Sequence, residues 1–181
     1  QQSVAIGPDD TAAEVMDRVS IAAEQLFEKL LPELVAGRLQ ATPLDLSQGS
    51  YFGGRRPEDG RIDWQQSAAA IHNLVRAVAP PYPGAFCDLH GMRLRILRTR
   101  RMPTAELASP SEIPAPGPAH THPTCLWRHN GALYARCGDG TDLQLLAFEL
   151  QSADGQVQAC DIDALQQRFG PMPITLCPPQ P

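Results

Sequence analysis

Ser50-Tyr-Phe-Gly-Gly-Arg-Arg-Pro-Glu-Asp-Gly-Arg-Ile-Asp-Trp64 is the stretch at which two parts of different character meet in this 181-residue chain. It continues through a short amphipathic segment to Pro81-Tyr-Pro-Gly-Ala-Phe86. The sequence before it has the period of a long helix, whereas the sequence after it has short apolar runs separated by tight-turn signals. This order predicts an α+β fold in which the quoted stretch connects a helical part to a small β domain.

The N-terminal part begins with a strand candidate at Ser3–Ile6. Thr11 and Glu14 have the spacing of a capping box, and apolar residues then recur every three or four positions. This pattern predicts an amphipathic helix of about six turns that ends at Gly37. Because a strand followed by a long helix is typical of α/β domains, we interpret residues 1–40 as the C-terminal end of a truncated α/β domain.

Residues 39–61 have no hydrophobic period and are expected to form a long loop. Arg55, Arg56 and Arg61 allow two interpretations within it. In the first interpretation they form a clamp for a diphosphate group. Adjacent guanidiniums bind phosphate oxygens bidentately, and Gly53-Gly54 lets the backbone approach a ligand. The alternative, commoner on base rates, is a solvated run of charges. The local acidic partners would then be Glu58, Asp59 and Asp63.

A second helix is predicted from Ser67, a candidate N-cap, to the residue before Pro80-Pro81, which end the pattern. Its apolar positions are Ile71, Leu74, Val75 and Val78. His72 lies beside this apolar stripe, and without a neighbouring nucleophile or acid in triad order we interpret it as structural. Residues 41–84 are therefore expected to be a linker and a connector helix.

Tight-turn signals divide the remaining sequence into short strands. Asn-Gly and Asp-Gly favour type I′ turns, in which both central residues have positive φ. The predicted elements are strands over 85–89 and 92–99 around His90-Gly91, a meander over 124–150 with turns at Asn130-Gly131 and Asp139-Gly140, and a helix from Asp163 to Phe169 capped by Asp161. Short strands with one small helix predict a compact β-barrel of the OB type over residues 85–181.

Two groups of side chains in this part could carry function. One is a series of arginines that marks either a nucleic-acid edge or a solvated strand face, and the neutral surroundings favour the strand face. These arginines are Arg93, Arg95, Arg98, Arg100 and Arg101. The other is His120-Thr-His122 in a Pro-rich stretch, which could place two imidazoles near a metal but offers no third ligand, so a linker is the favoured interpretation.

The composition excludes several classes of protein. The formal net charge is -5, which argues against a non-specific nucleic-acid binder. Five cysteines without a Cys-x-x-Cys pair indicate neither a disulfide framework nor a zinc site, so a reducing cytoplasm is the expected location. No apolar run approaches the ~20 residues that span a bilayer, and we expect no membrane association. The chain begins at Gln1, which suggests a fragment or a processed product.

Several motifs together resemble the C-terminal part of 10-formyltetrahydrofolate-dependent formyltransferases. They are the strand and helix start at 4–14, Arg61-Ile-Asp-Trp64, Ile71-His-Asn-Leu-Val-Arg-Ala77, Pro83-Gly-Ala-Phe86, Cys137-Gly-Asp-Gly140 and the run from Leu143 to Leu150. Within this family, Tyr51-Phe-Gly-Gly-Arg-Arg-Pro-Glu-Asp-Gly60 is similar to the branch that formylates UDP-4-amino-4-deoxy-L-arabinose for lipid A modification.

The resemblance implies where the chemistry of such an enzyme is located. In the family an Asn, a His and an Asp of a Rossmann-like N-terminal domain act near a Ser-Leu-Leu-Pro loop that lines the folate site, and none of these motifs occurs here. No catalytic residue is therefore assigned to this chain, and 10-formyltetrahydrofolate is expected to be bound by a missing N-terminal domain. Tyr51, Arg55 and Arg56 are expected to contact the UDP-amino sugar.

Two other functions stay open. A methionyl-tRNA formyltransferase would use the barrel to contact tRNA, which predicts a cationic barrel surface that the charge count does not supply. A non-catalytic binding or assembly module is indicated instead if the apolar face of the first helix packs against a partner.

Overall fold

The computed structural model describes residues 1–54, 56–102 and 124–176. It divides into two compact units, Gln1–Arg56 and Pro57–Pro181, which are described separately. No helix in the described ranges is long and apolar enough to cross a membrane.

The first unit is built on helix α1, Ala12–Val35. The predicted capping box is confirmed: the Thr11 backbone N–H donates to Glu14 Oε2 at 2.7 Å, and the Glu14 N–H donates to Thr11 Oγ1 at 3.4 Å. Beyond the C-cap the chain leaves the helix at Gly37, whose φ of 68° is the left-handed conformation that glycine adopts without strain. No residue of α1 is buried.

The prediction of a strand at Ser3–Ile6 is wrong. This segment has no ladder partner among the residues described, because the first unit contains no other strand for it to pair with. Val4 and Ile6 instead line a groove against Val15 and Val19 of α1. The helical half of the predicted α/β piece is thus present in the structure, and its assignment to an α/β domain stays a prediction. The loop after α1 is irregular, as predicted, apart from the short 3-10 helix η1, Leu46–Gln48.

The second unit contains a mixed arrangement of helices and one antiparallel sheet. Its strands are β1 Ala85–Leu89, β2 Met92–Arg101, β3 Cys125–His129, β4 Ala132–Arg136, β5 Asp142–Gln151, β6 Val157–Ala159 and β7 Ile174–Thr175. The sheet order is β1-β2-β5-β4-β3-β7, and β6 pairs with β5. Strand β5 is the central strand of the sheet. It pairs with β2 along one edge and with both β4 and β6 along the other. The predicted hairpin and meander are confirmed.

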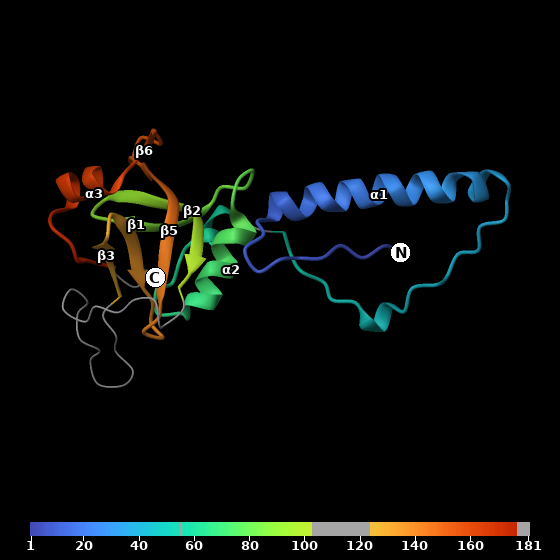
Figure 1. Cartoon of the computed structure of the whole chain (residues 1–181), viewed down its shortest axis with the longest axis horizontal. Coiled ribbons are helices and arrows are strands. Elements are labelled where there is room, and N and C mark those ends of the chain that lie inside the picture. Colours follow the sequence, from blue (N-terminus) through green and yellow to red (C-terminus); the bar gives the residue numbers. More distant parts are fainter. Residues whose placement is uncertain (55, 103–123, 177–181) are drawn as a thin grey trace. The chain divides into compact units, whose positions relative to one another are not determined.

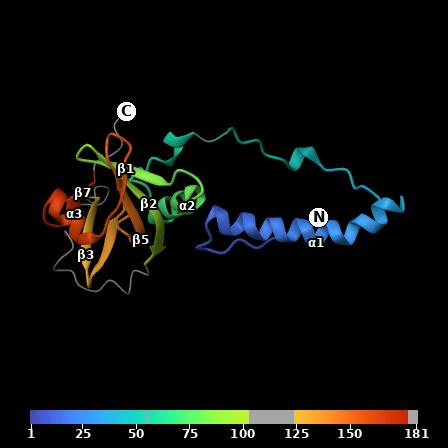
Figure 2. The same cartoon turned by 90° about the horizontal axis from the view of Figure 1, so that it is seen from above.

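The sheet curls into a half-barrel (Figures 1 and 2). Register shifts around Arg98 interrupt the pairing of β2 with β5, and such bulges bend strands and increase their twist. A small β domain of the predicted kind is therefore present. Closure into an OB-type barrel is not seen in the part of the chain described, because the end strands β1 and β7 do not pair with each other.

Helix α2, Ala68–Val78, is the predicted connector helix, and Ser67 Oγ accepts the Ala70 N–H as its cap. It lies against β2 in both views (Figures 1 and 2). Helix α3, Ile162–Phe169, lies near β3 at the other side of the sheet and is capped by Asp161, as predicted. A short 3-10 helix, η2 Pro57–Gly60, precedes the connector.

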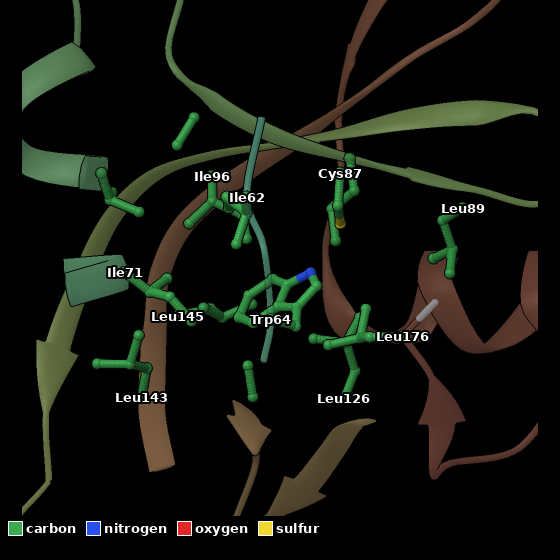
Figure 3. Close-up of a cluster of buried hydrophobic side chains, with 14 of the residues drawn as sticks. Ile62, Trp64, Ile71, Cys87, Leu89, Ile96, Leu126, Leu143, Leu145 and Leu176 are labelled. Atoms are coloured by element: carbon green, nitrogen blue, oxygen red, sulfur yellow. The ribbon is translucent and has the colours of Figure 1, made fainter. Parts of the chain in front are cut away.

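Trp64 is the centre of the main hydrophobic core (Figure 3). Its side chain is fully buried and lies among Ile62 and Ile71 of the connector and side chains from β1, β2 and β5. The indole nitrogen has no acceptor at hydrogen-bonding distance within the described ranges and is turned toward Cys87. The connector therefore supplies the middle of the core that the sheet encloses.

Candidate functional site

The predicted substrate contacts Tyr51, Arg55 and Arg56 lie on the loop that leads to η2. Tyr51 is 96% exposed, and Arg56 is also exposed. Arg55 lies outside the described residues. A Cβ added at Gly53 or Gly54 would meet no atom within 4 Å, so the backbone of this loop is open to a ligand. The role of Tyr51, Arg55 and Arg56 in substrate binding stays a prediction.

Arg61, in contrast, has a well-defined position beside strand β1. The η2 turn delivers it there: the Arg61 N–H donates to Glu58 O at 2.9 Å, and Gly60 is buried against the backbone of Gly84. A Cβ at Gly60 would lie 2.8 Å from Gly84 O, which explains why a glycine ends this turn. The next residue continues the contact, because the Ile62 N–H donates to Phe86 O at 2.8 Å.

Four side chains meet on the outer face of the β1–β2 hairpin, and we call them the arginine cluster: Arg61, Phe86, Asp88 and Arg93. The guanidinium carbons of Arg61 and Arg93 lie 5.0 and 3.8 Å from the centre of the Phe86 ring, which are cation–π distances. Both arginines also contact one carboxylate. Arg61 Nη1 lies 2.7 Å from Asp88 Oδ2, and Arg93 Nε lies 3.4 Å from Asp88 Oδ1.

The cluster has an excess of positive charge. Partial burial alone would raise the pKa of Asp88, but hydrogen bonds and charge from Arg61 and Arg93 hold it below its ordinary value. The carboxylate is therefore ionised at neutral pH, and the three ionised groups sum to one net positive charge. The neighbouring Arg95 does not add to this excess, because it forms an ion pair with Glu149 and donates from Nε to Pro83 O at 2.9 Å.

Glu58, Asp59 and Asp63 are the predicted local partners of Arg55, Arg56 and Arg61, but the ion pair of Arg61 is with a residue of the hairpin. Asp63 instead accepts hydrogen bonds from the Gln65 backbone N–H and the Gln66 side chain. The acid that pairs with Arg61 is Asp88, which the fold brings from the hairpin. The proximity of Asp88 and Arg93 could have been derived from the sequence. A two-residue turn at His90-Gly91 places these residues opposite each other, as the observed register does.

Of the histidines considered for a functional role in the sequence, only His72 lies within the described residues. His72 is 2% exposed, and its Nδ1 lies 2.9 Å from Thr99 Oγ1 of β2, which agrees with the predicted structural role. His120 and His122 lie outside the described residues. Within those residues no three His, Cys, Asp or Glu side chains are grouped as metal ligands would be.

A second cluster lies on the face of β3 that points away from the main hydrophobic core. Trp127 stacks on Tyr134 with ring centres 4.7 Å apart, and its Nε1 donates to Asp142 Oδ1 at 3.1 Å. Arg136 holds the same carboxylate through Nε at 2.7 Å and Nη2 at 2.8 Å. All four side chains are buried, so this cluster is a satisfied polar network and not an open site.

An open cavity of about 550 Å³ lies at the turn between β3 and β4. Arg128 lines it, but its Nη1 is already held by Asp163 Oδ1 at 2.7 Å and Gln166 Oε1 at 2.8 Å. Arg128 thus links α3 to the sheet, and its charge is balanced by Asp163. The arginine cluster, in contrast, has one positive charge more than it has negative charges.

Comparison with known proteins identifies the second unit. The model of the family "Formyl transferase, C-terminal domain" matches residues 55–162. The chain is also similar in structure to HypX from Aquifex aeolicus, in a variant with six alanine substitutions, with a TM-score of 0.57 and 16% sequence identity. That similarity covers 93% of this chain and 27% of the HypX chain, so this chain spans about a quarter of the length of that protein.

Proposed function

This chain belongs to the formyl transferase C-terminal domain family, and on that premise we propose that it is the C-terminal portion of an enzyme that formylates the amine of a UDP-amino sugar. The observation that carries the proposal is the family match over residues 55–162. The acceptor is suggested by Tyr51–Gly60, whose sequence is similar to the UDP-4-amino-4-deoxy-L-arabinose branch.

Catalysis in this proposal takes place outside the chain, because the sequence lacks the catalytic motifs of the family. 10-formyltetrahydrofolate supplies the formyl group and is held by the preceding domain, so no residue of this chain is assigned to it. The residues of this chain bind and orient the acceptor. Tyr51 presents an exposed ring to the nucleotide, and Arg55 and Arg56 contact its diphosphate.

The apolar surface of α1 supports a preceding domain in the same polypeptide. Large apolar side chains along the helix are exposed in the first unit: Met16, Val19, Ile21, Phe27, Leu31, Leu34 and Val35. A helix with so much exposed apolar area is expected to pack against another element. In the proposed enzyme this element is the body of the α/β domain, to which α1 contributes its last helix.

Formyl transfer by the polypeptide that joins this chain to its preceding domain tests the proposal. Initial rates are measured with a UDP-4-amino sugar and, separately, with methionyl-tRNA as acceptor. We expect turnover with the sugar, and for Arg55→Ala a rise of about tenfold in KM with little change in kcat, because a charged contact to the diphosphate is lost from ground state and transition state alike. The matched control is Gln48→Ala, an exposed change in the same loop.

The outcomes separate the parts of the proposal. An unchanged KM for Arg55→Ala would show that Arg55 does not contact the diphosphate. Turnover with methionyl-tRNA alone would show that the acceptor is methionyl-tRNA and not a UDP-amino sugar. Absence of formyl transfer to either acceptor rejects the enzymatic function.

A second candidate is a non-catalytic assembly module, which the exposed apolar face of α1 also favours. Sedimentation velocity of the 181-residue chain tests whether α1 needs a partner at all. A folded chain that stays monomeric at high micromolar concentration argues against the assembly module and also against the preceding domain, whereas formyl transfer by the longer polypeptide separates the two candidates.

A further inference from the structure

Within the part of the chain that the structure describes, the two arginines of the arginine cluster use few of their hydrogen-bond donors. Among the described residues, only Nη1 of Arg61 and Nε of Arg93 meet a side-chain acceptor, and both contacts go to Asp88. Each guanidinium carries five N–H groups, so several remain for solvent or for a ligand. Both side chains reach the surface, with exposed fractions of 35% for Arg61 and 39% for Arg93.

A purely structural role explains only part of this arrangement. One arginine between the connector and Asp88 would be enough to hold the connector against β1, and Arg61 does so at 2.7 Å. Arg93 adds a second guanidinium on the same ring and a weaker contact of 3.4 Å to the same carboxylate. Asp88 offsets only one of the two positive charges, and a further anion would offset the one that remains.

We propose that Arg61 and Arg93 form a subsite for a phosphate or diphosphate group on the outer face of the β1–β2 hairpin. Guanidiniums bind phosphate oxygens bidentately, and the Phe86 ring restricts both side chains before the ligand arrives. Arg61 follows Arg56 by five residues in the sequence, with the η2 turn between them. The identification of the phosphate group as the diphosphate of a nucleotide sugar rests on the proposed function, whereas the subsite itself does not.

Binding of pyrophosphate, UDP and uridine to the 181-residue chain tests the subsite. Two-dimensional NMR at about 20 mM salt is suitable, because low ionic strength leaves exposed charges weakly screened. We expect pyrophosphate and UDP to shift the amide signals of β1 and β2, and uridine to leave them unchanged. Arg93→Gln is expected to weaken both interactions at least about tenfold, since one charge-assisted contact is lost.

Arg128→Gln is the matched control, since Arg128 is also 39% exposed and ion-paired but lies on β3 beside α3. It should change the affinity less than twofold. Arg61→Gln tests the second arginine, and because it can loosen the connector its thermal unfolding is measured alongside. Arg93→Gln keeps the test decisive if Arg61→Gln does not fold.

Each result decides the question. Loss of pyrophosphate binding in Arg93→Gln but not in Arg128→Gln supports the subsite, even if no UDP-sugar is ever formylated. If the unaltered chain does not bind pyrophosphate, or if Arg93→Gln binds it equally well, the subsite is rejected. Either result leaves the proposed formyl transfer untouched, because that function is tested by a separate assay.

Discussion

Gly138 lies where the backbone of the connector meets the turn between β4 and β5. Its N–H donates to Trp64 O at 2.8 Å and to Gln66 O at 3.2 Å. A Cβ at this position would lie 2.1 Å from Gln65 O, a separation that real side chains do not tolerate. The approach of two backbones therefore requires glycine here, independently of its backbone dihedral angles.

Replacing this glycine tests the contact. Gly138→Ala is expected to lower the free energy of unfolding by about 3 kcal/mol, because backbone on both sides must move apart. Gly54→Ala is the control: the added methyl group meets no atom within 4 Å, so a change of less than about 0.5 kcal/mol is expected. Urea unfolding followed by tryptophan fluorescence measures both, and equal stability of the two variants would show that the close approach is not required.

The thiols differ strongly in their surroundings. Burial raises the pKa of Cys87 to about 12. Cys160 is only half-buried, although burial raises its pKa as well. Because the thiolate is the form that reacts with alkylating agents, Cys87 should be the less reactive thiol.

Alkylation of the native chain with iodoacetamide at pH 8, mapped by mass spectrometry, checks this order. Cys160 is expected to react at least about tenfold faster than Cys87, and the difference should vanish in urea because unfolding removes the burial. Comparable rates in the native state would contradict the burial of Cys87 in the core.

At the scale of elements, local signals in the sequence were sufficient where contacts are local. The capping box at Thr11, the cap at Ser67 and the turn at Asn130-Gly131 each fix a structure within a few residues, and all three are observed. The strand at Ser3–Ile6 failed because a strand needs a partner that propensity cannot supply. The arginine cluster joins residues up to 32 positions apart, from Arg61 to Arg93, so only its hairpin half could be derived from spacing.

The polar network between β3, β4 and β5 is an element-level contact with a measurable cost. Asp142 accepts from Trp127 and twice from Arg136, and both charged side chains are buried. Asp142→Asn leaves the guanidinium without its counter-charge, and we expect a loss of about 3–5 kcal/mol in the free energy of unfolding at pH 7.

The matched control for this ion pair is Asp163→Asn, which removes the exposed partner of Arg128. Exposed ion pairs contribute little, so a loss below about 1 kcal/mol is expected. Chemical unfolding of both variants makes the comparison. A cost for Asp142→Asn as small as that of the control would mean that water or another group compensates Arg136.

At the scale of the whole molecule, the core belongs to the second unit alone. Every described residue of the main core cluster lies at Ile62 or later, and no residue of α1 is buried. The sequence suggested that the β domain begins at residue 85. The structure shows that residues 57–84 contribute Ile62, Trp64, Ile71 and Val75 to the same core.

Two shortened chains therefore should behave differently. Residues 57–181 keep the complete cluster, so their Tm should lie within about 4 °C of the full chain, corresponding to about 1 kcal/mol. Residues 85–181 lose the Trp64 indole and four large aliphatic side chains of the core cluster, namely those of Ile62, Ile71, Val75 and Val78. Each such side chain stabilises a core by about 2–5 kcal/mol, so the summed loss is at least as large as the 5–15 kcal/mol that a domain typically has, and we expect this chain not to fold. Near-ultraviolet circular dichroism and thermal unfolding distinguish the outcomes. A native spectrum from 85–181 would make the connector an accessory of the sheet, whereas an unfolded 57–181 would mean that α1 and its loop stabilise the β domain.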